Sequence, residues 1–257
     1  MRCYALATMA AHPLALVLAL TLMVACIGCA STSPTETAPA PSAGATPMVW
    51  VYLKTAPMSA SQTPESSQEN FKGHMANMKR LAEQRKLLVA GPFDHPKDST
   101  WRGIFLFDVP TVDDAKALVA TDPGVIAEVF ATELHPVIAP AALRDAYENE
   151  QRLLARTDAD TPRDPGSPPP NIRAYVMVTA SNGAQAALAI RQSPWRDKVL
   201  FAVRLTDSPG AIFVLDAPAK EDVAASLTPE AIGGGSIDSW WSTASLVDLP
   251  NKAGSLP

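Results

Sequence analysis

Alternating and helical spacings of apolar residues divide the chain between residues 48 and 139 into six elements. Segments such as MVWVYLKT and WRGIFLFDV are rich in β-branched and aromatic residues, which is typical of strands. Apolar residues recur at helical spacing from Phe71 to Leu81, and Ser66 with Glu69 has the form of a capping box before them. The pattern predicts strands at 48–55, 86–93, 101–109 and 131–139, and helices at 67–84 and 111–122. Their order is β-α-β-β-α-β.

The same order recurs in the second half of the chain. GIFLFDVPTVDDAKALVATDP (103–123) aligns without a gap with AIFVLDAPAKEDVAASLTPEA (211–231), and the identical positions include Ile104/Ile212 and Asp108/Asp216. The second set comprises strands at 173–180, 198–205, 211–218 and 236–247, with helices at 183–192 and 220–228. The chain is therefore predicted to be an internal duplication of a split, ferredoxin-like β-α-β unit.

The duplication indicates how the two units pack. A four-stranded sheet of this kind carries helices on one face, so its other, apolar face has to be covered. The predicted fold class is α+β, with two ferredoxin-like (βαββαβ) repeats packed sheet to sheet as an intramolecular α/β barrel. We expect a first repeat at 48–140, a helix and proline-rich linker at 141–171, and a degenerate second repeat at 172–249. The expected state is a monomer that forms a pseudo-dimer by itself.

The segment before the first repeat predicts export. Residues 1–29 have the form of a signal peptide, whose apolar run at 14–25 is short for a membrane span of about 20 residues. Residues 30–47 are rich in Ser, Thr, Ala and Pro and predict an extended tether. An uncleaved membrane anchor is an alternative.

Two cysteines at the end of the signal predict a lipid anchor. The residues around Cys26 and Cys29 resemble the lipobox of bacterial lipoproteins, and Cys29 is favoured because the tether begins directly behind it. The expected lipidation site is Cys29, or alternatively Cys26, in a periplasm-facing lipoprotein of the outer membrane. Secretion to the periplasm without a lipid, after cleavage near Ala30, is the other alternative.

Composition excludes several classes of function. The formal net charge of −5 and the lack of a basic stripe argue against a nucleic-acid partner. No cysteine follows Cys29, so the two repeats hold no disulfide. Asp94-His95 with His135 matches no metal-ligand spacing, and no G-x-S-x-G motif occurs. No metal and no cofactor are therefore predicted.

Several segments of the first repeat resemble the YCII-related family of small α/β-barrel proteins. They are His74-Met75, LAEQRKLLVAGP, RGIFLFDV, DDAKALVATDPGV and ELHPV. The resemblance implies a fold similar to that of muconolactone isomerase, and a catalytic pair at the positions that match His74 and Asp122. Arg85 departs from the family, which commonly has glycine at this turn.

The implied pair would suit proton transfer. A carboxylate that holds one ring nitrogen of a histidine leaves the other to accept or donate a proton. Asp122 is expected at a helix C-terminus, where the helix dipole disfavours a carboxylate and a protonated histidine would compensate; an Asp before a proline is also an ordinary turn residue. In the second repeat the aligned positions are Ala186 and either Thr228 or Glu230, so any chemistry is expected in the first repeat.

Two functions follow from these observations. The first is an isomerase or lyase step that uses His74 and Asp122 on a small organic acid or lactone. The alternative is a non-catalytic module of the cell envelope that binds a small molecule between the repeats or stabilises an assembly.

Overall fold

The computed structural model describes residues 44–94, 100–156 and 168–250. Several predictions fall on residues outside these ranges. They concern the signal with Cys26 and Cys29, most of the tether, His95 and most of the linker. Among the described residues, no helix has the length and hydropathy needed to cross a membrane.

The first repeat contains the predicted elements with shifted ends. They are β1 (Ala45–Thr55), α1 (Pro64–Glu83), β2 (Leu87–Pro92), β3 (Trp101–Phe107), α2 (Val112–Val119), α3 (Pro123–Ile126) and β4 (Phe130–Pro140). Short 3₁₀ helices follow β1 and β4, at Pro57–Ser61 and Ala141–Asp145, and the second leads into α4 (Ala146–Arg156).

Two starting points differ from the sequence prediction. Helix α1 begins at Pro64, because the side chain of Thr63 accepts the backbone N–H of Ser66 and a proline suits the first helical position. The predicted capping box at Ser66 was therefore wrong. Strand β1 begins at Ala45, within the predicted tether, because it pairs with β4 as far as Pro140.

The second repeat follows the same order with shorter helices. It contains β5 (Ile172–Ala180), α5 (Gly183–Gln192), β6 (Val199–Leu205), β7 (Ala211–Leu215), α6 (Lys220–Ala224) and β8 (Gly235–Thr243). Short 3₁₀ helices lie at Arg196–Lys198 and Ala244–Asp248. The last strand thus ends earlier than the predicted 236–247, since Thr243 caps the 3₁₀ helix that follows it.

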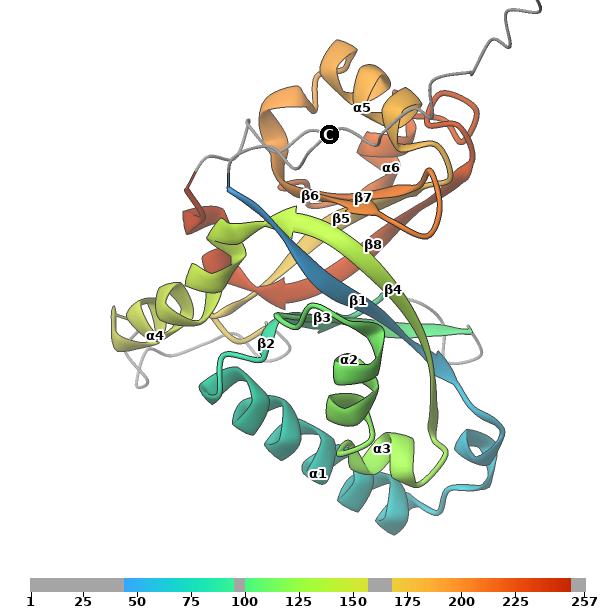
Figure 1. The fold of residues 1–257 in the computed structure, drawn as a ribbon, viewed down its shortest axis with the longest axis vertical. Helices are drawn as coiled ribbons and strands as arrows, with labels where there is room; N and C mark the ends of the chain where they lie inside the picture. Colours follow the sequence, from blue (N-terminus) through green and yellow to red (C-terminus); the bar gives the residue numbers. More distant parts are fainter. Residues whose placement is uncertain (1–43, 95–99, 157–167, 251–257) are drawn as a thin grey trace, which may run out of the picture. The chain divides into compact units, whose positions relative to one another are not determined.

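The strands form one antiparallel, eight-stranded sheet that curves into a nearly closed barrel (Figure 1). Its order is β2-β3-β1-β4-β6-β7-β5-β8, so each repeat contributes four adjacent strands. One seam is the β4–β6 pairing, where Val137 opposes Leu205. At the other seam, between β2 and β8, Phe93 forms a bridge with Trp240. The predicted fold class, two ferredoxin-like repeats packed as a barrel, is confirmed.

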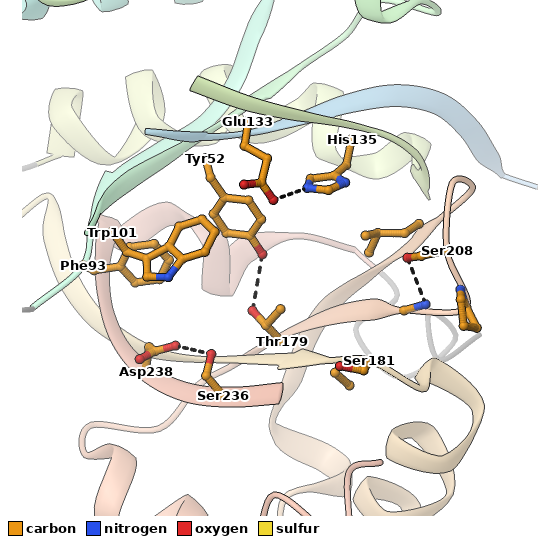
Figure 2. Close-up of a pocket in the computed structure, with 14 residues that line it drawn as sticks. Tyr52, Phe93, Trp101, Glu133, His135, Thr179, Ser181, Ser208, Ser236 and Asp238 are labelled. Atoms are coloured by element: carbon orange, nitrogen blue, oxygen red, sulfur yellow. Dashed lines mark hydrogen bonds and ion pairs between the residues drawn. The ribbon is translucent and has the colours of Figure 1, made fainter. Parts of the chain in front are cut away.

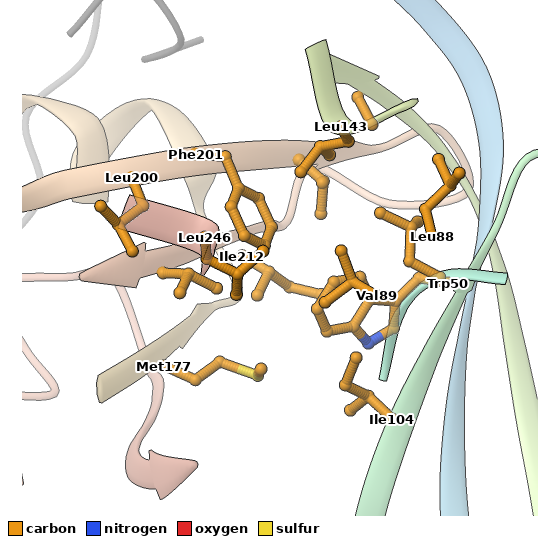
Figure 3. Close-up of a cluster of buried hydrophobic side chains, with 14 of the residues drawn as sticks. Trp50, Leu88, Val89, Ile104, Leu143, Met177, Leu200, Phe201, Ile212 and Leu246 are labelled. Atoms are coloured by element: carbon orange, nitrogen blue, oxygen red, sulfur yellow. The ribbon is translucent and has the colours of Figure 1, made fainter. Parts of the chain in front are cut away.

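Apolar side chains fill three layers. The middle layer lies between the two halves of the barrel and includes Trp50 and Ile104 of the first repeat, and Met177 and Phe201 of the second (Figure 3). The outer layers join each half to its own helices. Burial of apolar side chains on both faces of the sheet is the main stabilising contribution expected for this architecture.

Candidate functional site

The structure brings His74 and Asp122 together on the helix side of the first repeat. Nδ1 of His74, on α1, lies 2.7 Å from Oδ2 of Asp122. The imidazole is stacked on Phe105 of β3, with ring centroids 5.8 Å apart, and contacts Phe130 of β4 at 5.3 Å. Asp122 is fully buried, whereas 11% of the His74 side chain stays exposed. Within the described ranges, no group forms a hydrogen bond with Nε2 of His74.

A close contact between two helices positions the pair. A Cβ atom at Gly73 would lie 2.9 Å from the ring of Pro123, so glycine allows α1 to approach α3 at this point. The sequence predicted Asp122 at the end of a helix, but Asp122 is the N-cap of α3. Its Oδ1 accepts a hydrogen bond from the backbone N–H of Gly124 at 2.8 Å. The expectation of an unfavourable helix dipole at Asp122 was therefore wrong.

Burial and hydrogen bonding act in opposite directions on Asp122. Burial raises the pKa of its carboxyl group, but the hydrogen bond and charge of His74, with the N–H of Gly124 and the amide of Asn77, hold the pKa below its usual value. Behind the carboxylate, Arg80 donates to the side-chain oxygen of Asn77 at 2.6 Å. Asp122 is thus held as a carboxylate that accepts a hydrogen bond from Nδ1 of His74.

A separate cavity of about 480 Å³ lies on the other side of the sheet, between the two repeats. Three aromatic rings of the first repeat form one wall: Trp101 packs edge-on against Tyr52 at 4.4 Å, and Phe93 stacks on Tyr52 at 6.5 Å. The hydroxyl group of Tyr52 points to Thr179 of the second repeat, 3.4 Å away (Figure 2). Burial raises the pKa of Tyr52 to about 12. His74 does not line this cavity.

The polar groups of the cavity come from both repeats. Glu133 and His135 lie on β4, and Nε2 of His135 is 2.9 Å from Oε1 of Glu133. Asp238, on β8, accepts the hydroxyl group of Ser236 at 2.6 Å on the opposite wall (Figure 2). Lys54 forms an ion pair with Glu133, and the hydrogen bond from Lys54 lowers the pKa of that carboxyl group.

The comparison with known families covers the first repeat. Residues 48–136 match the sequence profile of the YCII-related domain. The first repeat is a YCII-related domain. This agrees with the resemblance found in the sequence. No curated protein matches the chain.

A comparison with solved structures finds similarity to part of the chain in the following protein. It is 5-chloro-2-hydroxyhydroquinone dehydrochlorinase (TftG) from Burkholderia phenoliruptrix AC1100, in complex with 2,5-dihydroxybenzoquinone. The identity is 22%, the match covers 34% of this chain and 89% of that one, and the TM-score is 0.27.

The second repeat lacks the pair that the YCII-related domain has. Ala186, aligned with His74, is fully buried in the apolar layer under α5. The hydroxyl group of Thr228 accepts the backbone N–H of Ala231 at 3.3 Å, a capping bond like that of Asp122 but at an exposed position. An apolar contact thus replaces the histidine, and a neutral side chain makes the capping bond.

The described residues do not form the metal site that was considered from the sequence, Asp94 and His95 with His135. His135 lies in the cavity, Asp94 lies at the end of β2, and His95 is outside the described residues. In the part of the chain that the structure describes, no group of three or more His, Cys, Asp and Glu side chains could hold a metal ion. Ligand binding between the repeats was the alternative function expected from the sequence, but the residues that line this cavity were not named there, although alternation places Tyr52 on the same strand face as the core residue Trp50.

Proposed function

We propose that the YCII-related domain is an acid–base catalyst in which His74 carries the proton. The observation that supports this is the 2.7 Å contact between Nδ1 of His74 and the buried carboxylate of Asp122. Because a carboxylate accepts hydrogen bonds, Nδ1 carries the proton in this contact and Nε2 of the neutral ring can accept one. Asp122 then stabilises the imidazolium that forms and fixes the orientation of the ring.

The reaction we infer is an isomerase or lyase step on a small organic acid or lactone. Such a step removes a proton from carbon and returns it, or expels a leaving group, and one histidine can serve in both directions. The ring of Phe130, which is partly exposed beside the imidazole, offers apolar contact to a small substrate, and the buried ring of Phe105 supports the imidazole. The substrate class follows from the family resemblance.

We also propose that the protein is exported and anchored through a lipid on Cys29, or alternatively Cys26. The support is the signal-like segment 1–29 and the tether that follows it. Diacylation would supply enough buried chain for stable anchoring. The alternative function, a non-catalytic ligand-binding module, is favoured by one observation: the cavity of about 480 Å³ lies on the sheet face opposite His74.

Proton exchange in deuterated water tests the catalytic proposal. The purified protein is incubated with a panel of small keto acids, hydroxy acids and unsaturated lactones, and deuterium uptake at carbon is followed by NMR. We expect uptake with at least one member of the panel, no uptake above background with His74→Gln, and a loss of about 10²-fold or more with Asp122→Asn.

Asp113→Asn is the matched control, because Asp113 is exposed and pairs with Lys116 on the surface of α2. It should exchange at the wild-type rate. Melting curves establish that each variant is folded. Equal exchange by the wild type and His74→Gln, or no exchange by the wild type across the panel, would overturn the proposal.

A further inference from the structure

Asn77 provides a buried amide on α1, one turn after His74. Asn77 is 8% exposed. Its Oδ1 accepts a hydrogen bond from the guanidinium group of Arg80 at 2.6 Å, and the hydroxyl group of Thr121 lies 3.1 Å from the same oxygen. A guanidinium group can only donate hydrogen bonds, so the contact with Arg80 fixes which end of the amide is the oxygen. The amide of Asn77 therefore has one orientation.

The nitrogen end of this amide acts on the carboxyl group of Asp122. Nδ2 of Asn77 is buried and, among the described residues, makes no hydrogen bond of normal geometry. Burial raises the pKa of Asp122, and the interactions that lower it again include one with the amide of Asn77. A buried N–H group without a full hydrogen bond is costly, so its place in a native structure needs a reason. Here the reason offered by the surroundings is the carboxylate.

Two other donors hold the carboxylate of Asp122, one at each oxygen. Oδ2 lies 2.7 Å from Nδ1 of His74, and Oδ1 accepts the backbone N–H of Gly124 at 2.8 Å. Gly124 belongs to α3, whereas Asn77 belongs to the same helix as His74. Residues three positions apart on a helix are neighbours on its surface, so the amide and the imidazole approach the carboxylate together.

The second repeat has neither the pair nor the amide. Helix α5 (Gly183–Gln192), which takes the place of α1, contains no histidine and no asparagine. A simple tie between neighbouring helices could serve both repeats. The amide is instead found in the repeat that has the histidine and the buried aspartate, as expected for a residue that serves this pair.

We propose that Asn77 is a positioning residue for the His74–Asp122 pair. Its amide, held by Arg80, keeps the carboxylate of Asp122 in the orientation that Nδ1 of His74 requires, so that Nε2 stays directed away from Asp122. The effect of Asn77 on Asp122 stands on the contacts alone. Its consequence for proton transfer rests on the proposed function.

Replacement of Asn77 by aspartate separates this role from a purely structural one. Asn77→Asp keeps the shape of the side chain and an oxygen for Arg80, but places an oxygen where Nδ2 lies. A residue that only ties Arg80 to the helix would tolerate this change. We expect deuterium exchange at carbon to fall about tenfold or more, as loss of one hydrogen bond to a charged group implies. Gln68→Glu makes the same amide-to-carboxylate change at an exposed position of α1 and should exchange at the wild-type rate.

A second measurement does not depend on activity. The titration of Asp122 is followed by NMR of its carboxyl carbon. Asn77→Leu should raise the pKa of Asp122 by about one unit, because the carboxylate loses a donor, and Arg80→Met should raise it by less. Lys79→Met removes the same charge from the neighbouring, exposed position of α1 and should leave the titration unchanged. Melting curves establish that each variant is folded, and Arg80 is exposed, so its replacement is expected to be tolerated.

Two results would overturn the proposal. One is exchange at the wild-type rate by Asn77→Asp. The other is an unchanged titration of Asp122 in Asn77→Leu, or in Arg80→Met if Asn77→Leu is unfolded. The proposed function fails separately: if the wild type shows no exchange with any substrate of the panel, the titration alone decides the role of Asn77.

Discussion

Replacing Gly91 by alanine would force open the seam where β2 and β8 close the barrel. The backbone of β2 approaches β8 so closely that a Cβ atom at Gly91 would overlap the carbonyl oxygen of Trp241 and lie 2.9 Å from its carbonyl carbon. The contact is with backbone, so no side-chain rotation relieves it. The two strands would have to separate.

The cost follows from the hydrogen bonds at this seam. The indole of Trp240 donates to the carbonyl of Gly91 at 3.1 Å, and the hydroxyl group of Ser242 donates to the carbonyl of Ala90 at 2.7 Å. Trp240 is fully buried and Ser242 is 3% exposed. A buried polar group left without a partner costs about 1–3 kcal/mol, so loss of both bonds would destabilise the fold by about 2–6 kcal/mol. That is a large part of a typical total of about 5–15 kcal/mol.

Urea unfolding followed by tryptophan fluorescence measures this loss. Gly91→Ala should lower the free energy of unfolding by about 2–6 kcal/mol, and Ser242→Ala, which removes one of the two bonds, by about 1–3 kcal/mol. Ser67→Ala, at an exposed position of α1, is the control and should stay within about 0.5 kcal/mol of the wild type. A wild-type midpoint and slope for Gly91→Ala would show that the two halves do not close on each other as described.

Three further predictions concern single residues. The pKa of Asp122 is lower in the folded state than the value of about 4 in the unfolded chain, so the ionised carboxylate stabilises the fold. This contribution is complete above about pH 4 and is lost as the pH falls through the folded pKa. Asp122→Asn should therefore be less stable at neutral pH, and its free energy of unfolding should change less between neutral and acidic pH. Arg85 has a φ of 57° and packs over Tyr147 at 3.9 Å, so Arg85→Gly should be about 1 kcal/mol more stable than Arg85→Ala, because both lose the contact and only glycine relieves the backbone. In a bacterial host, Cys29→Ser should abolish incorporation of labelled palmitate and Cys26→Ser should not; the reverse result would assign the lipid to Cys26.

The elements that depend on local sequence were predictable. The helix predicted at 111–122 begins where Thr111 caps α2, because its side chain accepts a hydrogen bond from the N–H of Asp114. The repeated segments at 103–123 and 211–231 lie at equivalent places in the two halves. The start of β1 was missed because Ala45–Pro47 has the composition of a tether and becomes a strand through pairing with β4. The intrinsic strand propensity of a segment does not predict a strand whose hydrogen bonds come from a partner distant in the sequence.

Parts of the candidate sites could be predicted from the sequence, and other parts depend on the fold. The family resemblance pointed to His74 and Asp122, and their contact is a geometric fact, although their role stays a prediction. The capping bond of Asp122 to Gly124 was hidden, because the Asp-Pro sequence fits either the end of one helix or the start of the next. The residues that line the cavity could not be named from the sequence, because they depend on register: only the pairing of strands shows that Tyr52 meets Thr179.

The residues of the second repeat argue for a role beyond covering the first. Away from the cavity, the second repeat presents large apolar side chains to the middle layer, among them Met177 and Phe201. A repeat retained only to shield the first sheet would be expected to continue this pattern. At the cavity it instead presents Thr179, Ser236 and Asp238, which face aromatic rings of the first repeat. Duplication within one chain allows the two halves to differ at these positions, so polar and aromatic walls can meet in one site.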